Sequence, residues 1–160
     1  MSRKSSRAGI TLMELLVVMT LLGLMVGVSY PSISAGLESL RLSSATDSIV
    51  SFLNSGLNRA ERRQQVVEIT ISKRENALWL RSAGPGFVRK LELPEGVTIA
   101  RVLPEFPGAP AAADRSVLLY PGSAPPRIGV EISNRRGARR IVSVDPISRI
   151  PVVEQLEQGQ

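Results

Sequence analysis

ITLMELLVVMTLLGLMVGVSY, residues 10–30, is the stretch that decides the fold of this chain. As a helix, these 21 residues would extend for about 31 Å, which matches the hydrocarbon thickness of a bilayer. Glu14, in the expected second helical turn, is the only charged residue in the run. An ionised carboxylate in lipid is costly unless it has a partner. On its charge alone, Glu14 could equally lie at the membrane interface or in a cleaved signal peptide.

The residues before this stretch are basic. Arg3, Lys4 and Arg7 all precede Gly9, so a product that begins at Ile10 would carry a formal charge of +6 − 3 = +3. A basic segment next to an apolar run stays on the cytoplasmic side of a membrane. We therefore expect the rest of the chain to face outward.

The residues after Pro31 keep a helical period. Apolar side chains recur every three to five positions, which predicts an amphipathic helix over residues 31–64. This stripe consists of Ile33, Leu37, Leu40, Ala45, Ile49, Phe52, Leu53, Leu57 and Ala60. We expect residues 10 to about 64 to form one long helix with a bend at Pro31. Its half at residues 10–30 would span the membrane, and its second half would pack against a domain.

An alternation typical of β-strands follows, beginning with Val67, Ile69 and Ile71. Six or seven short strands separated by turn residues are expected within residues 65–153, as an antiparallel sheet. We expect a loop at residues 104–114, a hairpin tip at 134–140 and a frayed tail at 154–160. The fold class is therefore α+β, with one long helix packed on an antiparallel β domain.

Composition excludes much chemistry. The chain has 160 residues, enough for one small core, and contains neither cysteine nor histidine. Thiol nucleophiles and the commonest metal ligands are therefore missing. Asp47, Asp114 and Asp145 are too far apart in sequence to form a calcium loop. No catalytic motif is present, so we expect no enzyme activity, no metal and no cofactor.

The stretch RAGITLMELLVVMTLLGLMVGVSYP resembles the prepilin signature of type IV pilins and type II secretion pseudopilins. Those proteins have a basic leader that ends in glycine, then a hydrophobic residue, a threonine or similar residue, and glutamate as the fifth mature residue. Gly9, Ile10, Thr11 and Glu14 fill these places. Pro31 stands where the family has a helix kink. Ile10 replaces the usual phenylalanine, which leaves the efficiency of N-methylation open.

The resemblance implies a pilin-like fold and a function in filament assembly. A prepilin peptidase would remove residues 1–9, and Ile10 would become the methylated N-terminus. Glu14, with Thr11 beside it, would guide assembly by pairing with the terminal amine of a neighbouring subunit. The implied partners are that peptidase, other major and minor pseudopilins, the inner-membrane assembly platform and the lipid bilayer. The chain would be a single-pass inner-membrane protein with a periplasmic domain.

Two further segments resemble the GspH/FimT family, NRAERRQQVVEITI and the closing RIGVEISNRRGARRIVSVDPISRI. The frequent Gly-Arg ending is replaced by Ser148 and Arg149. Minor pilins often carry a disulfide, and major pseudopilins a calcium loop. The absence of both patterns favours a minor H-type pseudopilin near the tip of a type II secretion filament. A type IV pilus minor pilin of the FimT type is the alternative.

Two other interpretations concern parts of the chain. Arg135, Arg136, Arg139 and Arg140 could form a DNA-binding patch for uptake, or they could be a solvated hairpin tip without aromatic residues for stacking. The N-terminus could be an ordinary secretory signal peptide. Against that, Glu14 interrupts the apolar run, and the helical period continues past Pro31.

Overall fold

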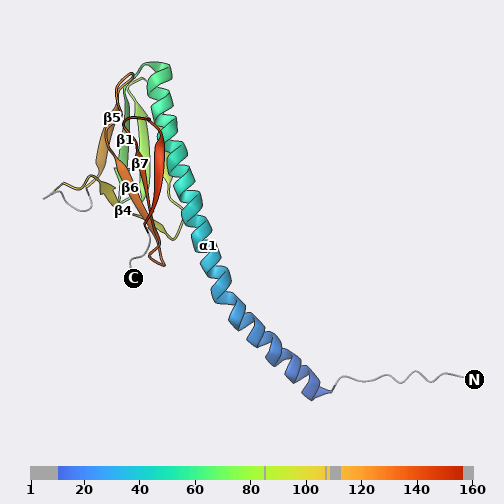
Figure 1. The fold of residues 1–160 in the computed structure, drawn as a ribbon. Helices are drawn as coiled ribbons and strands as arrows, with labels where there is room; N and C mark the ends of the chain where they lie inside the picture. The colour runs from blue at the N-terminus through green and yellow to red at the C-terminus, as the bar shows by residue number, and fades with distance from the viewer. Residues whose placement is uncertain (1–10, 85, 107, 109–112, 157–160) are drawn as a thin grey trace, which may run out of the picture. The chain divides into compact units, whose positions relative to one another are not determined.

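The computed structural model describes residues 11–84, 86–106, 108 and 113–156, with the exception of the side chains of residues 28–35. The chain divides into two compact units, residues up to Leu37 and residues from Glu38 onward. Helix α1 (Leu12–Arg63) contributes to both units, and eight strands follow it in the described part of the second unit (Figure 1). A helix with antiparallel sheets packed on it confirms the predicted α+β, pilin-like class.

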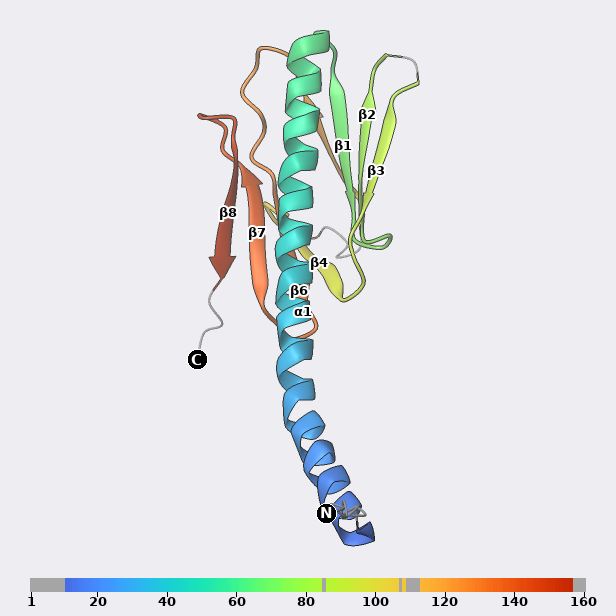
Figure 2. The same ribbon diagram turned by 90° about the vertical axis from the view of Figure 1, so that its right-hand side faces the viewer.

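The strands form two four-stranded antiparallel sheets and not, as predicted, one sheet of six or seven strands. Their bounds are β1 (Val67–Ser72), β2 (Ala77–Ser82), β3 (Val88–Glu92), β4 (Val97–Leu103), β5 (Arg115–Leu119), β6 (Gly129–Asn134), β7 (Arg139–Val144) and β8 (Pro151–Leu156). The strand order is β3-β2-β1-β5 in the first sheet and β4-β6-β7-β8 in the second. In Figure 2, β7 and β8 appear on one side of α1, and β1, β2 and β3 on the other.

The frayed tail predicted for residues 154–160 is wrong for its first three residues. Residues 154–156 belong to β8, which pairs with β7 through Glu154 opposite Ile141 and Leu156 opposite Arg139. Residues 157–160 lie outside the described part of the chain. VVEQL does not alternate between apolar and polar residues, so the sequence gives no strand signal there, and the strand is defined by its pairing with β7.

The second half of α1 and the inner faces of both sheets share one hydrophobic core. From the helix this core takes Leu42, Ala45, Ile49, Phe52, Leu53 and Ala60, and from the strands it takes Val67, Ile69, Ile71, Leu78, Leu80, Val97, Ile99, Val102, Leu119, Val130, Ile132, Val142 and Val144. These helical positions are three or four residues apart for the most part, so they lie on one face. The predicted stripe is therefore confirmed from Ala45 onward.

The beginning of the predicted stripe needs a correction. Leu37 and Leu40 are exposed, and Leu42 is buried instead. Two residues along a helix correspond to about 200° of rotation, so Leu40 and Leu42 point in nearly opposite directions. Ile33 is among the residues whose side chains the structure does not describe.

Asn76 joins the two sheets. Its backbone has a φ of 52° in the turn between β1 and β2, which favours asparagine. Its Nδ2 donates to the carbonyl oxygen of Val97 at 2.7 Å, and its Oδ1 accepts from the N–H of Ile99 at 2.9 Å. One side chain thus fixes the first strand of the second sheet to a turn of the first.

Candidate assembly and recognition sites

Helix α1 begins with a hydrogen-bonded cap. Oγ1 of Thr11 accepts a hydrogen bond from the N–H of Glu14 at 3.3 Å, and the Thr11 carbonyl accepts one from the N–H of Leu15 at 3.1 Å. Threonine followed three residues later by glutamate is the pattern of a capping box, and the positive end of the helix favours the carboxylate. Glu14 lies in the first turn and not, as predicted, in the second, because the described helix begins at Leu12.

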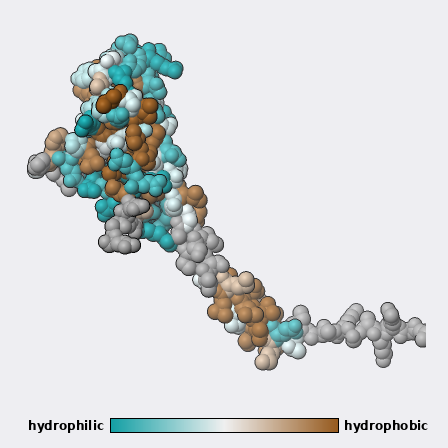
Figure 3. Space-filling view, in the orientation of Figure 1, coloured by the Kyte–Doolittle hydropathy of each residue, from teal (hydrophilic) through white to brown (hydrophobic). Residues whose placement is uncertain are grey.

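Apolar side chains lie on all sides of the segment around and after Glu14. The exposed residues are Leu12, Met13, Leu15, Leu16, Val17, Val18, Met19, Leu21, Leu22, Leu24, Met25 and Val26. The visible face of this segment is correspondingly brown in Figure 3. No described side chain forms an ion pair with the Glu14 carboxylate. Within the described residues, no helix combines the length and the apolar character needed to cross a membrane.

The other predicted processing positions cannot be placed. Gly9 and Ile10 lie outside the described residues. Helix α1 continues through Pro31, whose side chain is not described, so the bend there stays a prediction. The structure thus places Thr11 and Glu14 and leaves cleavage and N-methylation as predictions.

The four arginines of the predicted patch lie on the hairpin between β6 and β7. Oδ1 of Asn134 closes its turn by accepting hydrogen bonds from the N–H groups of Arg136 at 3.1 Å and Ala138 at 2.9 Å. Gly137 has a φ of 81°, a conformation that glycine adopts without steric cost. The hairpin predicted for residues 134–140 is therefore present, with β7 beginning already at Arg139.

Each of these arginines contacts a polar side chain. The pairs are Arg135–Glu95 at 2.9 Å, Arg136–Glu38 at 3.3 Å, Arg139–Glu131 at 3.4 Å and Arg140–Ser43 at 3.2 Å. Even so, the side chains of Arg135, Arg136 and Arg139 remain 62%, 49% and 53% exposed. Half-exposed guanidinium groups can still bind an anion, because surface ion pairs are weak.

Sequence reasoning missed a buried carboxylate. Glu131 is 0% exposed on β6, and it lies between Arg101 of β4 and Arg139 of β7. Nε and Nη2 of Arg101 both donate to Oε2 of Glu131 at 2.7 Å. These hydrogen bonds, followed by the charge of Glu131, raise the pKa of the Arg101 guanidinium. The alternation in RIGVEIS indicated only that Glu131 points away from the core; its partners depend on strand register, which the sequence does not reveal.

The turn between β7 and β8 is tied to the end of α1. The Asp145 carboxylate accepts hydrogen bonds from the Ser148 hydroxyl at 2.7 Å and from the N–H groups of Ile147 and Ser148, and these lower the pKa of Asp145. Nη1 of Arg149 donates to Oε1 of Glu61 at 2.7 Å, and its Nη2 donates to the Ser123 carbonyl oxygen. This turn presents Ile147 with 90% of its surface exposed.

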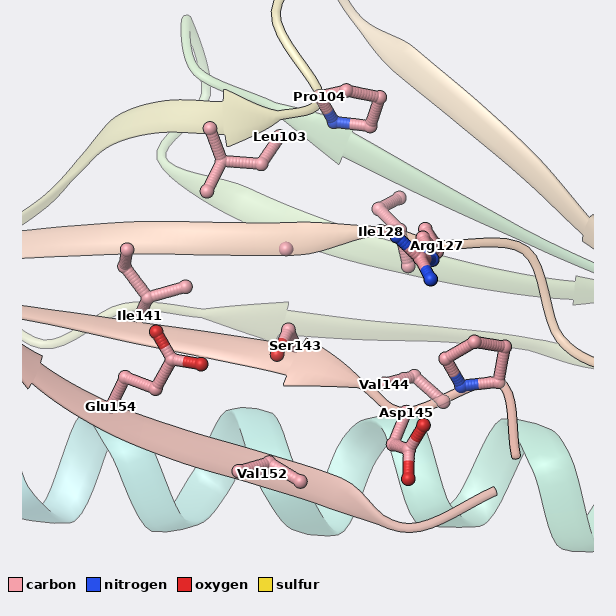
Figure 4. A pocket seen from close by; sticks show the side chains of 12 residues that line it. Leu103, Pro104, Arg127, Ile128, Ile141, Ser143, Val144, Asp145, Val152 and Glu154 are labelled. Carbon is pink, nitrogen blue, oxygen red and sulfur yellow. The ribbon is translucent and has the colours of Figure 1, made fainter. Parts of the chain in front are cut away.

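A groove of about 560 Å³ crosses the outer face of the second sheet (Figure 4). Leu103, Gly129, Ser143 and Val152 are successive partners across the four strands, and all four line the groove. Gly129 and Ser143 are the small residues of this row, and a Cβ on Gly129 would lie 3.4 Å from Cβ of Leu103 and 3.5 Å from Cγ2 of Ile141. The groove has the volume of a typical ligand pocket, and its lining combines apolar side chains with Arg127, Asp145 and Glu154.

A comparison with protein-family models matched the prokaryotic N-terminal methylation motif over residues 4–30. This range contains Gly9, Ile10, Thr11 and Glu14, the positions that the sequence predicted for processing and assembly. No curated protein and no solved structure matched the chain.

Proposed function

We propose that this type IV pilin-like chain is a minor pseudopilin of a type II secretion system, assembled near the tip of a periplasmic filament. The methylation motif supports the pilin-like part of this function, including processing by a prepilin peptidase and assembly with other pilins. The H-type assignment rests on the resemblance of NRAERRQQVVEITI and the closing hairpin to the GspH/FimT family. The role is mechanical and not catalytic.

In this proposal, the peptidase cuts after Gly9 on the cytoplasmic face. The basic residues before the cut hold the leader in the cytoplasm, so the segment at residues 10–30 spans the inner membrane once. The domain that begins at Glu38 then lies in the periplasm. The newly formed amine of Ile10 is methylated, and the inner-membrane platform adds the subunit to the filament.

Glu14 is the observation that carries this proposal. Its carboxylate follows the capped start of α1, among exposed apolar side chains and without an ion-pair partner among the described residues. In contrast, the buried carboxylate of Glu131 has two arginines as ion-pair partners. A carboxylate in lipid requires a counterpart. The amine of Ile10 in a neighbouring subunit would supply it.

Processing is tested by intact-mass analysis of the chain purified from membranes after co-expression with a prepilin peptidase. We expect the measured mass to be lower by the mass of residues 1–9 and higher by that of one methyl group on Ile10. Glu14→Gln should be cut to the same extent. A product that keeps the leader, or that begins near Ala35 like a secreted protein, would contradict the proposal.

Assembly is tested by crosslinking between subunits in membranes. Because the chain has no cysteine, one introduced cysteine reports on one position. Glu14→Gln should lower the crosslinked fraction about tenfold or more, since losing a desolvated ion pair costs several kcal/mol. Glu68→Gln, on the domain, is the matched control and should crosslink normally. Equal crosslinking of both variants would show that Glu14 has no role in assembly.

The type of filament is tested in a host that carries both machineries. Deletion of the gene should abolish export of secreted enzymes and leave pilus-dependent motility and DNA uptake unchanged. The opposite pattern would favour the FimT-type minor pilin. In that case the exposed Arg135, Arg136, Arg139 and Arg140 become the candidate DNA contacts, and binding of a labelled duplex should fall steeply with salt.

A further inference from the structure

We propose that the arginine-rich end of the second unit binds anionic phospholipid headgroups of the membrane that anchors the chain. This basic end consists of Arg41 on α1 and Arg135, Arg136, Arg139 and Arg140 on the β6–β7 hairpin. The inference rests on the membrane anchoring in the proposed function and adds a second membrane contact. It assigns the arginine cluster a lipid ligand in place of DNA.

The basic end is assembled from two segments that are about 95 residues apart in the chain. Arg136 pairs with Glu38 at 3.3 Å, and Arg140 donates to the hydroxyl of Ser43 at 3.2 Å, so the hairpin lies against the first residues of α1 in this unit. A Cβ added at Gly96 would lie 3.7 Å from Nε of Arg135 and 3.9 Å from Nη1 of Arg41. Guanidinium groups of both segments therefore lie close to Gly96.

The charges at this end leave a positive excess. The five arginines share this end with the three carboxylates Glu38, Glu95 and Glu131, a balance of 5 − 3 = +2, and Glu131 is also bound by Arg101. Glu131 is wholly buried and the Glu38 side chain is 22% exposed, whereas Arg135, Arg136 and Arg139 are about half exposed. The charge at the surface is consequently more positive than the balance suggests. Glu95, 83% exposed, holds Arg135 in a pair that phosphate can replace.

The length of chain between the apolar segment and this end suits a membrane contact. Seven residues lie between Tyr30 and Glu38, and α1 is helical throughout, so the eight helical steps extend for about 12 Å along the chain. The headgroup layer itself is about 5 to 8 Å thick, and electrostatic attraction extends about 8 Å further at physiological salt. The basic end therefore lies within reach of lipid phosphates along the chain.

The residue type also fits phosphate. All five cations are arginines, and a guanidinium group binds two phosphate oxygens with parallel hydrogen bonds. DNA offers the same phosphate chemistry, but residues 38–43 and 134–140 contain no aromatic side chain on which bases could stack. A membrane anchor in the same chain also keeps lipid phosphates at a high effective concentration. These points favour lipid.

The experiment uses the full chain reconstituted into bilayers of phosphatidylcholine alone or mixed with phosphatidylglycerol. A single cysteine at Pro94, which is exposed next to Glu95, carries a fluorophore, and the bilayer contains a lipid-attached quencher. Ala124→Cys is the control label, because Ala124 neighbours Ser123, which is linked through Arg149 to Glu61 at the far end of α1. We expect stronger quenching at position 94 in anionic bilayers, reversed by salt, and no change at position 124.

Variants identify the groups responsible. Arg135→Gln with Arg136→Gln should reduce contact with the anionic surface about fivefold per arginine. Arg62→Gln with Arg63→Gln removes the same charge from the end of α1 and should leave the quenching unchanged. Equal quenching in both bilayers, or an unaffected hairpin variant, would overturn the inference. Release of the hairpin from anionic bilayers by a short DNA duplex at equal phosphate concentration would overturn it in favour of DNA.

Flotation with phosphatidylcholine vesicles separates this inference from the proposed function. A chain that does not float has no membrane anchor, and then the proposed function fails. A chain that floats but shows no dependence on anionic lipid keeps its anchor, and only the lipid contact of the basic end is disproved.

Discussion

The two halves of α1 are both rich in aliphatic residues, but they expose them differently. From Leu12 to Val26 the large apolar side chains are exposed on every side, whereas from Leu42 to Ala60 they are buried along one face. A helix apolar on all sides is typical of a lipid environment, and one with a single apolar face is typical of packing on a domain. The spacing of the apolar residues, more than their number, therefore distinguishes the two halves of α1.

The largest contrast is expected at leucines. Leu53 is 1% exposed in the core, and Leu21 is 56% exposed. Leu53→Ala should lower the free energy of unfolding by about 2 to 5 kcal/mol, because it removes buried methyl groups and leaves a cavity. Leu21→Ala should leave it unchanged. Urea unfolding of the full chain in detergent micelles, followed by the fluorescence of the single tryptophan, Trp79, measures both. Similar losses of unfolding free energy in the two variants would show that the two halves of α1 contribute equally to the stability of the fold.

Glycines provide the second contrast. A Cβ on Gly56 would lie 3.0 Å from Cδ1 of Leu80 and 3.1 Å from Cδ1 of Ile69, whereas one on Gly23 would meet nothing within 4 Å. Gly56→Val should cost about 1 to 3 kcal/mol through overpacking. Gly23→Val should leave the unfolding of the domain unaltered in the same urea experiment. A Gly56→Val chain as stable as the parent would show that the helix and the sheets can move apart freely.

These patterns explain how much of the fold the sequence predicts. Alternation and turn residues locate seven of the strands, and the helical spacing after residue 44 gives the correct buried face. The division into two sheets depends on long-range pairing, such as β1 with β5 and β4 with β6, for which local patterns carry no information. The predicted buried stripe contains Leu40 and not Leu42. At the edge of such a stripe, the helical spacing fits either leucine equally well.

The candidate sites were predictable to different degrees. Thr11 and Glu14 belong to a local motif, so their spacing alone predicts them, and both lie within residues 4–30, which match the methylation motif. The two arginines bound to Glu131 come from strands on either side of it, and the groove over Gly129 depends on four strands. Such features exist only once the register is known.

Carboxylates give a third, smaller contrast within α1. Glu61 accepts hydrogen bonds from Arg149 at 2.7 Å and from the N–H of Gly122 at 3.1 Å, whereas no described side chain forms an ion pair with Glu14. Glu61→Gln should lower the free energy of unfolding by about 1 kcal/mol, since the pair is partly exposed. Glu14→Gln should leave the free energy of unfolding unchanged, although we expect it to impair assembly. The finding that would count against this division of roles is a destabilised domain in Glu14→Gln.

The smallest contrast concerns two threonines with the same local hydrogen bond. The hydroxyl of Thr46 donates to the carbonyl oxygen of Leu42 at 2.7 Å and is buried, and that of Thr20 donates to the carbonyl oxygen of Leu16 at 2.8 Å and is exposed. Each acceptor also receives a helical N–H, so Thr46→Val loses only a second bond to it, at a cost of about 0.5 kcal/mol. Thr20→Val should leave the unfolding of the domain unchanged, because its bond lies outside the packed half. If Thr46→Val were instead to lose several kcal/mol, the hydroxyl would have to fill a polar role in the core that the hydrogen bond to Leu42 does not explain.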